Sequence, residues 1–134
     1  MTTEIKTTKV SDKHRLAFLP KFFGKRMIAA ENRIYNVMSK ICDTYNGGYW
    51  NFYELSNGSF YMAPSGDKSY EIGISSNGYE GILSADAAGI VATLYVIYHF
   101  ACIDKSDQMV EQYYLLRDFA AEHSEANKIF AAID

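Results

Sequence analysis

The chain has 134 residues, the size of one ordinary domain; 49% of them are hydrophobic and 15% are aromatic. This composition excludes intrinsic disorder as the overall description, because ample apolar surface is available to form a core. The formal net charge is −3, from 13 basic and 16 acidic residues. Such a charge gives no global reason to expect nucleic-acid binding, and it excludes the dense array of carboxylates that a DNA mimic requires.

The charge is distributed unevenly along the chain. Residues 1–33 carry eight Lys or Arg against three acids, a net of +5, whereas residues 34–134 carry five against thirteen, a net of −8. The basic third is either a docking surface for an acidic partner or nucleic acid, or a solvated face with a basic tail. Its cations are Lys6, Lys9, Lys13, Arg15, Lys21, Lys25, Arg26 and Arg33.

Residues 1–10 are polar, rich in Thr and Lys, and without periodicity, which predicts a flexible N-terminal arm. Residues 11–134 then form a single domain. The first residues contain no apolar signal core, so we expect a cytoplasmic protein.

Two helices are expected before the middle of the chain. Ser11 is a candidate N-cap of the first, which Pro20 stops or kinks. Gly24 separates it from a second helix of about 17 residues, whose apolar positions recur at helical spacing. The predicted buried face comprises Met27, Ala30, Ile34, Met38 and Ile41.

The middle of the chain is rich in aromatic residues and contains two hairpin signals. The runs 49–55 and 59–63 are joined through Ser56-Asn57-Gly58, and the runs 70–74 and 79–83 flank Ser76-Asn77-Gly78. Asn-Gly between two such runs favours a type I′ turn, because both central residues need positive φ. The simplest topology is a four-stranded antiparallel meander.

Helices are expected again toward the C-terminus. Ser84 is a candidate N-cap for an apolar helix over residues 85–103. The uncharged stretch within it, residues 87–103, is short for a membrane span and indicates a buried central helix. Two more helices follow, at about 107–123 and from Ser124 to near Ile133. Helices, then strands, then helices predict an α+β fold, with the meander packed against helices from both ends of the chain.

No familiar catalytic or cofactor-binding pattern is present. The sequence lacks a glycine-rich phosphate loop, G-x-G-x-x-G, H-E-x-x-H and G-x-S-x-G. Cys42 and Cys102 are expected to be free, buried thiols, and His99 near Cys102 is better interpreted as a core histidine than as part of a catalytic or metal site. We therefore predict no catalytic residues, no cofactor and no metal.

The surplus of Tyr and Trp favours a protein interface instead. Tyr49 and Trp50 follow two glycines and are candidate interaction anchors together with Tyr53; the alternative is that Trp50 fills the core. Asp86 is a further candidate, or a carboxylate that favours the start of a helix. Asp134 adds a chain-end carboxylate for docking on a basic partner, or lies on a frayed terminus.

Several segments resemble the KlcA/ArdB family of antirestriction proteins. The similarity runs in order from about residue 14 to residue 134. Its motifs are Phe-Leu-Pro at 18–20 with Phe23-Gly24, Gly-Gly-Tyr-Trp at 47–50, Phe52-Tyr53, Leu55–Gly58, Phe60–Pro64, Ser84–Leu94, Leu116–His123, Glu125-Ala126, Ile129-Phe130 and Ala132–Asp134.

The resemblance implies a cytoplasmic inhibitor of type I restriction-modification enzymes that protects incoming foreign DNA, and one that is not a DNA mimic. We expect a non-enzymatic monomer whose partner is the restriction-modification enzyme or an associated host protein, with no membrane association and with direct DNA binding unfavoured. The alternative is a DNA-associated protein that uses the basic N-terminal third, whose affinity would fall steeply with salt.

Overall fold

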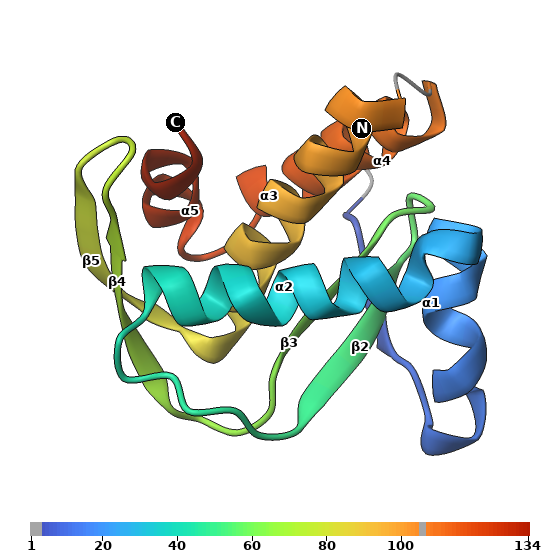
Figure 1. Cartoon of the computed structure of the whole chain (residues 1–134), viewed down its shortest axis with the longest axis horizontal. Coiled ribbons are helices and arrows are strands. Elements are labelled where there is room, and N and C mark those ends of the chain that lie inside the picture. The colour runs from blue at the N-terminus through green and yellow to red at the C-terminus, as the bar shows by residue number, and fades with distance from the viewer. Residues whose placement is uncertain (1–3, 105–106) are drawn as a thin grey trace.

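A computed structural model describes residues 4–104 and 107–134 and has the predicted α+β architecture (Figure 1). The strands are β1 (Thr7–Lys9), β2 (Trp50–Leu55), β3 (Phe60–Pro64), β4 (Ser69–Ile74) and β5 (Tyr79–Ser84). The α-helices are α1 (Arg15–Phe23), α2 (Met27–Ile41), α3 (Ala85–Asp104), α4 (Asp107–Ala121) and α5 (Ala126–Ile133). Short 3-10 turns at Asp12–His14 and Gly24–Arg26 precede α1 and α2.

Both Asn-Gly hairpins form, but they do not join into the predicted meander. β1, β2 and β3 make one antiparallel sheet in that order, and β4 and β5 make a separate two-stranded sheet. Gly58 and Gly78 have φ of 95° and 75°, as tight turns require. The amides of Asn57 and Asn77 also donate to Leu115 O and to Ala132 O, so each turn is tied to a C-terminal helix.

The two sheets are separate because α3 packs along the free edge of β3. The hydroxyl of Thr93 lies 3.3 Å from both the nitrogen and the carbonyl oxygen of Met62, where a neighbouring strand would otherwise bond. Gly89 permits this approach, since a Cβ there would overlap the backbone of Ala63. A helix thus covers an edge that the sequence predicted to pair with β4.

Residues 7–9, predicted to belong to a flexible arm, form strand β1 on the outer edge of β2. Thr7 pairs with Leu55 and Lys9 with Tyr53. The pairing continues past the strand, because the nitrogen of Lys6 donates to Ser56 Oγ at 2.8 Å. All three strand residues are exposed, so their sequence carries no alternation of apolar and polar residues that would predict a strand. Residues 1–3 of the predicted arm lie outside the described residues.

Pro20 lies inside α1 rather than at its end. It removes one helical hydrogen bond, which packing on both sides of it offsets. Phe18 and Phe22 are buried before and after Pro20, and Phe22 stacks with Phe60 of β3 at a centroid distance of 4.0 Å. Ser11 caps no helix; its hydroxyl bonds Nδ1 of His14 instead.

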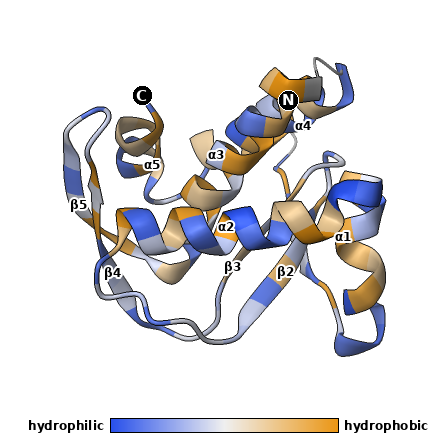
Figure 2. Cartoon of the chain, in the orientation of Figure 1, coloured by the Kyte–Doolittle hydropathy of each residue, from blue (hydrophilic) through white to orange (hydrophobic). Residues whose placement is uncertain are grey.

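Helices α2 and α3 differ in how far water reaches them. α2 shows alternating polar and apolar residues in Figure 2, and its predicted face is buried except at the half-buried Met27. α3 is long and apolar enough to cross a membrane, yet 61% of that segment is buried inside the molecule. It contacts β3, α2, α4 and α5, which is the position of a core helix.

Candidate functional site

A cluster of aromatic and ionisable side chains joins β3 to the first turn of α3 and the end of α4. The phenol of Tyr61, which is 2% exposed, donates a hydrogen bond to Oδ1 of Asp86 at 2.7 Å. Oδ2 of Asp86 lies 2.8 Å from Nε2 of His123. The Tyr61 ring also stacks with Tyr53 and with Phe119, at centroid distances of 4.8 and 5.6 Å. These five residues are called the Tyr61 cluster below.

Local structure places each member of the Tyr61 cluster. Tyr53 and Tyr61 are direct partners across the β2–β3 ladder, so their side chains share one face. Asp86 is the second residue of α3, which begins directly after β5, and in this first turn a carboxylate is favoured by the helix dipole. His123 lies just beyond the last residue of α4, and Phe119 lies one turn before it.

The hydrogen bonds of His123 define its tautomer. The backbone N–H of Glu125 donates to Nδ1 at 3.0 Å, so Nδ1 holds the lone pair. Nε2 therefore carries the ring proton and donates it to Asp86. Both nitrogens of a neutral imidazole are occupied in this way, and neither is free to take a proton from a substrate.

Ser84 and Glu125 form a second link between the start of α3 and the α4–α5 turn. The Ser84 hydroxyl accepts from the N–H of Ala87 at 3.1 Å, which confirms Ser84 as the predicted cap of α3. That hydroxyl donates to the Glu125 carboxylate, which also accepts the Ser84 N–H at 3.0 Å. Burial acts to raise the pKa of Glu125, but these hydrogen bonds from Ser84, together with the charge of Lys128, outweigh it and lower the pKa.

The arrangement suits a mechanical role better than a chemical one. Burial, and then the charge of Asp86, raise the pKa of Tyr61, so its phenol keeps its proton near neutrality and is no base. Asp86 accepts from two donors, and His123 is bonded at both nitrogens. The Tyr61 cluster therefore clamps β3, α3 and the α4–α5 turn together.

Tyr49 lies at a second position, on the surface beside Arg15. Its ring is 53% exposed, and its phenol donates to Oδ1 of Asp12 at 3.0 Å. The Arg15 guanidinium lies 4.4 Å from the centroid of Tyr49 and 4.2 Å from that of Phe52. Its Nη1 also donates to the carbonyl oxygen of Trp50 at 2.8 Å. Tyr49 is thus accessible and held in place by neighbours.

Trp50 belongs to the core, which corrects its selection as an interaction anchor. It is 2% exposed, and its Nε1 donates to the Tyr45 hydroxyl at 2.9 Å. The Tyr35 ring packs edge-on against the Trp50 ring, with the ring centroids 5.3 Å apart. The second sequence-based interpretation, that Trp50 fills the core, is the correct one.

The structure brings together two of the five predicted residues, Tyr53 and Asp86, because both contact Tyr61. Asp86 is both the expected helix-start carboxylate and a member of the Tyr61 cluster. Tyr49 lies apart, at the other end of β2, and exposed Asp134 follows the last residue of α5. The predicted residues therefore do not form one continuous site.

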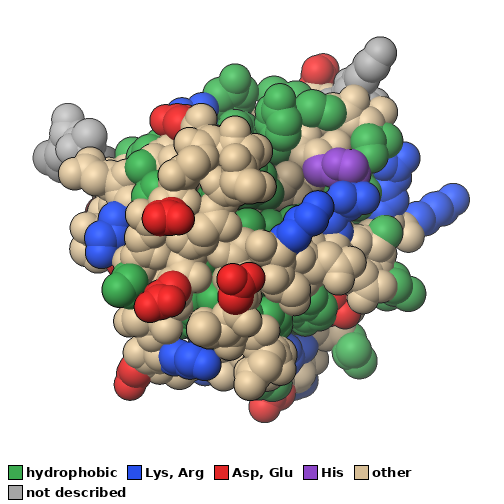
Figure 3. Space-filling model, turned by 60° about the vertical axis from the view of Figure 1, so that its left-hand side comes forward, with side chains coloured by type: hydrophobic (Ala, Val, Ile, Leu, Met, Phe, Trp, Pro, Cys, Tyr) green, Lys and Arg blue, Asp and Glu red, His purple; other side chains and the backbone are tan. Residues whose placement is uncertain are grey.

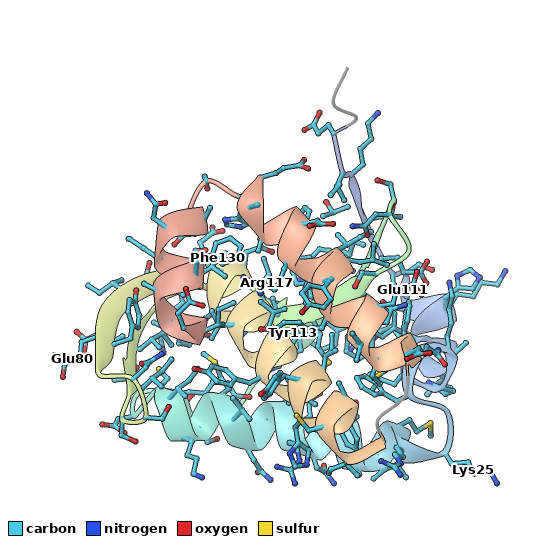
Figure 4. The ribbon with its side chains drawn as sticks, turned by 90° about the horizontal axis from the view of Figure 1, so that it is seen from above. Lys25, Glu80, Glu111, Tyr113, Arg117 and Phe130 are labelled. Carbon is cyan, nitrogen blue, oxygen red and sulfur yellow. The ribbon has the colours of Figure 1, made fainter. Side chains whose placement is uncertain are left out.

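Sequence reasoning missed Tyr61 and His123, because nothing in their spacing indicates contact. It also missed Arg117, whose guanidinium lies 5.7 Å from the centroid of Tyr113 and 5.4 Å from that of Phe130. Figure 4 shows Arg117 between these residues of α4 and α5. Arg117 thereby helps to join the last two helices.

The described residues offer little for metal chemistry. Among residues 4–104 and 107–134, no group of three or more His, Cys, Asp or Glu side chains is arranged to hold an ion. Cys42 is a free, buried thiol as expected, whereas Cys102 is free but exposed, which corrects the expectation that it is buried. The surface instead displays large apolar and aromatic side chains on α3 and α4, with Tyr98, Ile103 and Tyr114 each more than half exposed.

Comparisons with known proteins find one family, and the matches cover most of the chain. The family model described as antirestriction protein matches residues 43–134. An antirestriction protein KlcA of Escherichia coli is 44% identical, with 97% of this chain and 94% of the relative covered. The uncharacterized protein YfjX of Escherichia coli (strain K12) is 42% identical, with 98% and 89% covered.

A solved structure is also similar over the full length of both chains, with a TM-score of 0.91 and 44% identity. That work describes the KlcA and ArdB proteins as having a novel fold and antirestriction activity against Type I DNA restriction systems in vivo but not in vitro.

Proposed function

This chain belongs to the antirestriction protein family, and we propose that it inhibits type I restriction-modification systems in the cytoplasm and so protects incoming mobile DNA from cleavage. The observation that carries the proposal is that the whole fold, rather than one segment, is shared with proteins whose described activity is directed against type I systems. A shared fold alone would be a weak argument, but here the sequence similarity covers the same length.

We infer that inhibition proceeds by protein contact, without catalysis, cofactor or metal, and that the chain acts as a monomer. The His–carboxylate pair nearest to a catalytic constellation has its hydrogen-bonding groups satisfied by the fold itself. Exposed tyrosines, by contrast, are side chains that suit protein interfaces. Activity in vivo but not in vitro, described for the relatives, favours a partner that is either the restriction enzyme in its cellular setting or an associated host protein.

DNA association through the basic N-terminal third is the second candidate. At least three of the eight cations there already have partners. Arg15 lies over Tyr49 and Phe52, Lys21 pairs with Glu54 at 3.4 Å, and the Arg26 guanidinium lies 5.8 Å from the centroid of Phe100. Fewer cations are then available to contact phosphates, and the number of such contacts sets the affinity for DNA. Failure to retain a DNA duplex even at about 50 mM salt would exclude this candidate, whereas binding that falls steeply with salt would support it.

The proposed function is tested by plating unmodified phage on a host with a type I restriction system, with and without this chain. We expect higher plating efficiency with the chain present. A host with a type II system is the control and should show no relief. No relief in the type I host, from protein that is expressed and folded, would contradict the proposal.

A further inference from the structure

A groove between α2 and α3 is basic, and its lining includes neither Tyr49 nor any residue of the Tyr61 cluster. It has a volume of about 510 Å³, and its lining includes Asn32, Arg33, Asn36, Lys40, His99 and Ile103. None of the described residues that line it is acidic, and neither Arg33 nor Lys40 has an ion-pair partner within the described part of the chain. A chain with net charge −3 thus presents an uncompensated basic groove.

The basic groove is elongated. Arg33, Val37 and Lys40 lie at i, i+4 and i+7 on α2 and therefore share one face over two turns, about 10 Å. A second hollow, of about 270 Å³, is lined by Val37 and Lys40 together with residues 73–76, at the end of β4 and in the turn after it. Val37 and Lys40 thus line both hollows, which lie next to each other.

Apolar side chains line the groove together with the two cations. Val37 lines it from α2, and Phe100 and Ile103 line it from α3, where Ile103 is 54% exposed. The pKa of His99 is lowered by burial and by the charge of Arg33, so this ring is neutral at pH 7 and adds no charge. The groove therefore combines two separated cations with an apolar strip between them.

The charge changes sign beyond the second hollow. The next hollow shares Ile41 and Gly73 with it and is lined by Asp43, Glu71 and Glu80. Figure 3 shows one face on which a row of Lys and Arg side chains lies beside a histidine, with several acidic side chains apart from this row. A nucleic-acid backbone that crossed from the basic groove toward the third hollow would meet the carboxylates of Asp43, Glu71 and Glu80 and be repelled.

We propose that the α2–α3 groove binds an acidic amphipathic segment of the partner protein, with carboxylates meeting Arg33 and Lys40 and an apolar side chain seated between them. This rests on the proposed function and specifies its contact surface. Charge complementarity with an apolar centre suits a protein segment, since it supplies both orientation and buried area. The phosphate backbone of a nucleic-acid duplex offers no apolar side chain to this strip and requires a longer array of cations.

The test compares two double charge reversals of the full chain in the phage plating assay. Arg33→Glu with Lys40→Glu reverses the groove, and Lys6→Glu with Lys13→Glu makes the same change in net charge on exposed residues of the N-terminal third. We expect the groove variant to lose protection by about tenfold or more, since like charges would then face each other, and the control to protect as wild type does. Arg33→Lys with Lys40→Arg should retain protection, because the charge is kept.

Each other result has a distinct meaning. If wild type gives no relief, the proposed function fails before the groove is tested. If wild type protects and the groove variant protects equally, the groove proposal is overturned while the function stands. Equal losses of protection in both double variants would also overturn the groove proposal, because the change in net charge alone would then account for the loss. Circular dichroism and thermal unfolding identify misfolding, in which case Arg33→Gln with Lys40→Gln replaces the reversal and must show the same loss.

A crosslinking measurement identifies the occupant. A photoreactive benzophenone amino acid at position 36, between the two cations, is irradiated in cells that carry the type I system. We expect a crosslinked protein segment rich in Asp and Glu, absent when the groove charges are reversed. Crosslinking to nucleic acid, or to a segment without acidic residues, would overturn the proposal.

Discussion

His123 and Asp86 connect the end of α4 to the start of α3 through one hydrogen bond of 2.8 Å between Nε2 and Oδ2. Replacing Asp86 by Asn should destabilise the fold by about 1 to 3 kcal/mol. An amide can accept from the Tyr61 hydroxyl, but its N–H₂ would then face the N–H of His123. The other His123 tautomer would relieve that conflict only by opposing the N–H of Glu125.

Urea unfolding checks this prediction. Asp118→Asn, on the exposed surface of α4, is the matched control and should change stability by less than about 0.5 kcal/mol. Equal losses for the two variants would show that the Asp86–His123 bond does not clamp the helices.

Alkaline pH should destabilise the chain through two tyrosines. Burial raises the pKa of Tyr61 and, together with the charge of Glu31, raises that of Tyr35 to about 12, against 10.0 for the unfolded side chain. Above pH 10 the unfolded state releases these protons and the folded state does not. Stability is therefore full below pH 10 and falls as pH rises toward 12.

Unfolding free energies measured between pH 9 and pH 12 test the alkaline prediction. Tyr61→Phe and Tyr35→Phe should each make the decline shallower, because one shifted group is removed. A slope unaffected by these two variants would contradict the assignment.

Gly89→Ala should destabilise the fold by about 1 to 3 kcal/mol, because the added methyl would overlap backbone atoms, which cannot move aside as a side chain can. Gly73→Ala is a suitable control: nothing lies within 4 Å of a Cβ there. It should be neutral or slightly stabilising. Thermal unfolding of both variants tests whether the loss of stability comes from the close approach of α3 to β3 at Gly89. Equal losses for the two variants would show that it does not.

Thr93→Val keeps the shape of the side chain and removes the hydroxyl that lies 3.3 Å from both backbone groups of Met62 and 2.8 Å from Gly89 O. We expect a loss of about 1 to 3 kcal/mol, since buried backbone groups would be left without partners. Thr8→Val, on exposed β1, should have little effect. Comparable denaturation midpoints for wild type and Thr93→Val would show that packing alone covers the β3 edge.

Trp50 is the one tryptophan in the chain, so fluorescence reports on it directly. Its burial predicts blue-shifted emission and weak quenching by acrylamide in the folded state, with a red shift on unfolding. Trp50→Ala should destabilise the chain by about 3 to 5 kcal/mol, whereas Tyr49→Ala should leave the fold intact. Strong quenching in the native protein would show that Trp50 is accessible and would support its selection as an interaction anchor.

Local sequence patterns were enough to predict the α+β class, both hairpins, the buried face of α2 and the cap at Ser84. These features depend on residues close in the chain. Asn-Gly forces a turn, and an apolar repeat at helical spacing selects a helix face. The run of residues that resembles the antirestriction family could likewise be recognised without a structure.

Tertiary structure alone decided how the hairpins are used. Whether β3 pairs with β4 depends on Thr93 and Gly89, which lie about 30 residues away and compete for the same backbone groups. β1 forms because a strand edge was available to it, and its own residues give no strand signal. The Tyr61 cluster and the basic groove likewise combine residues from separate elements, and such contacts leave no local pattern in the sequence.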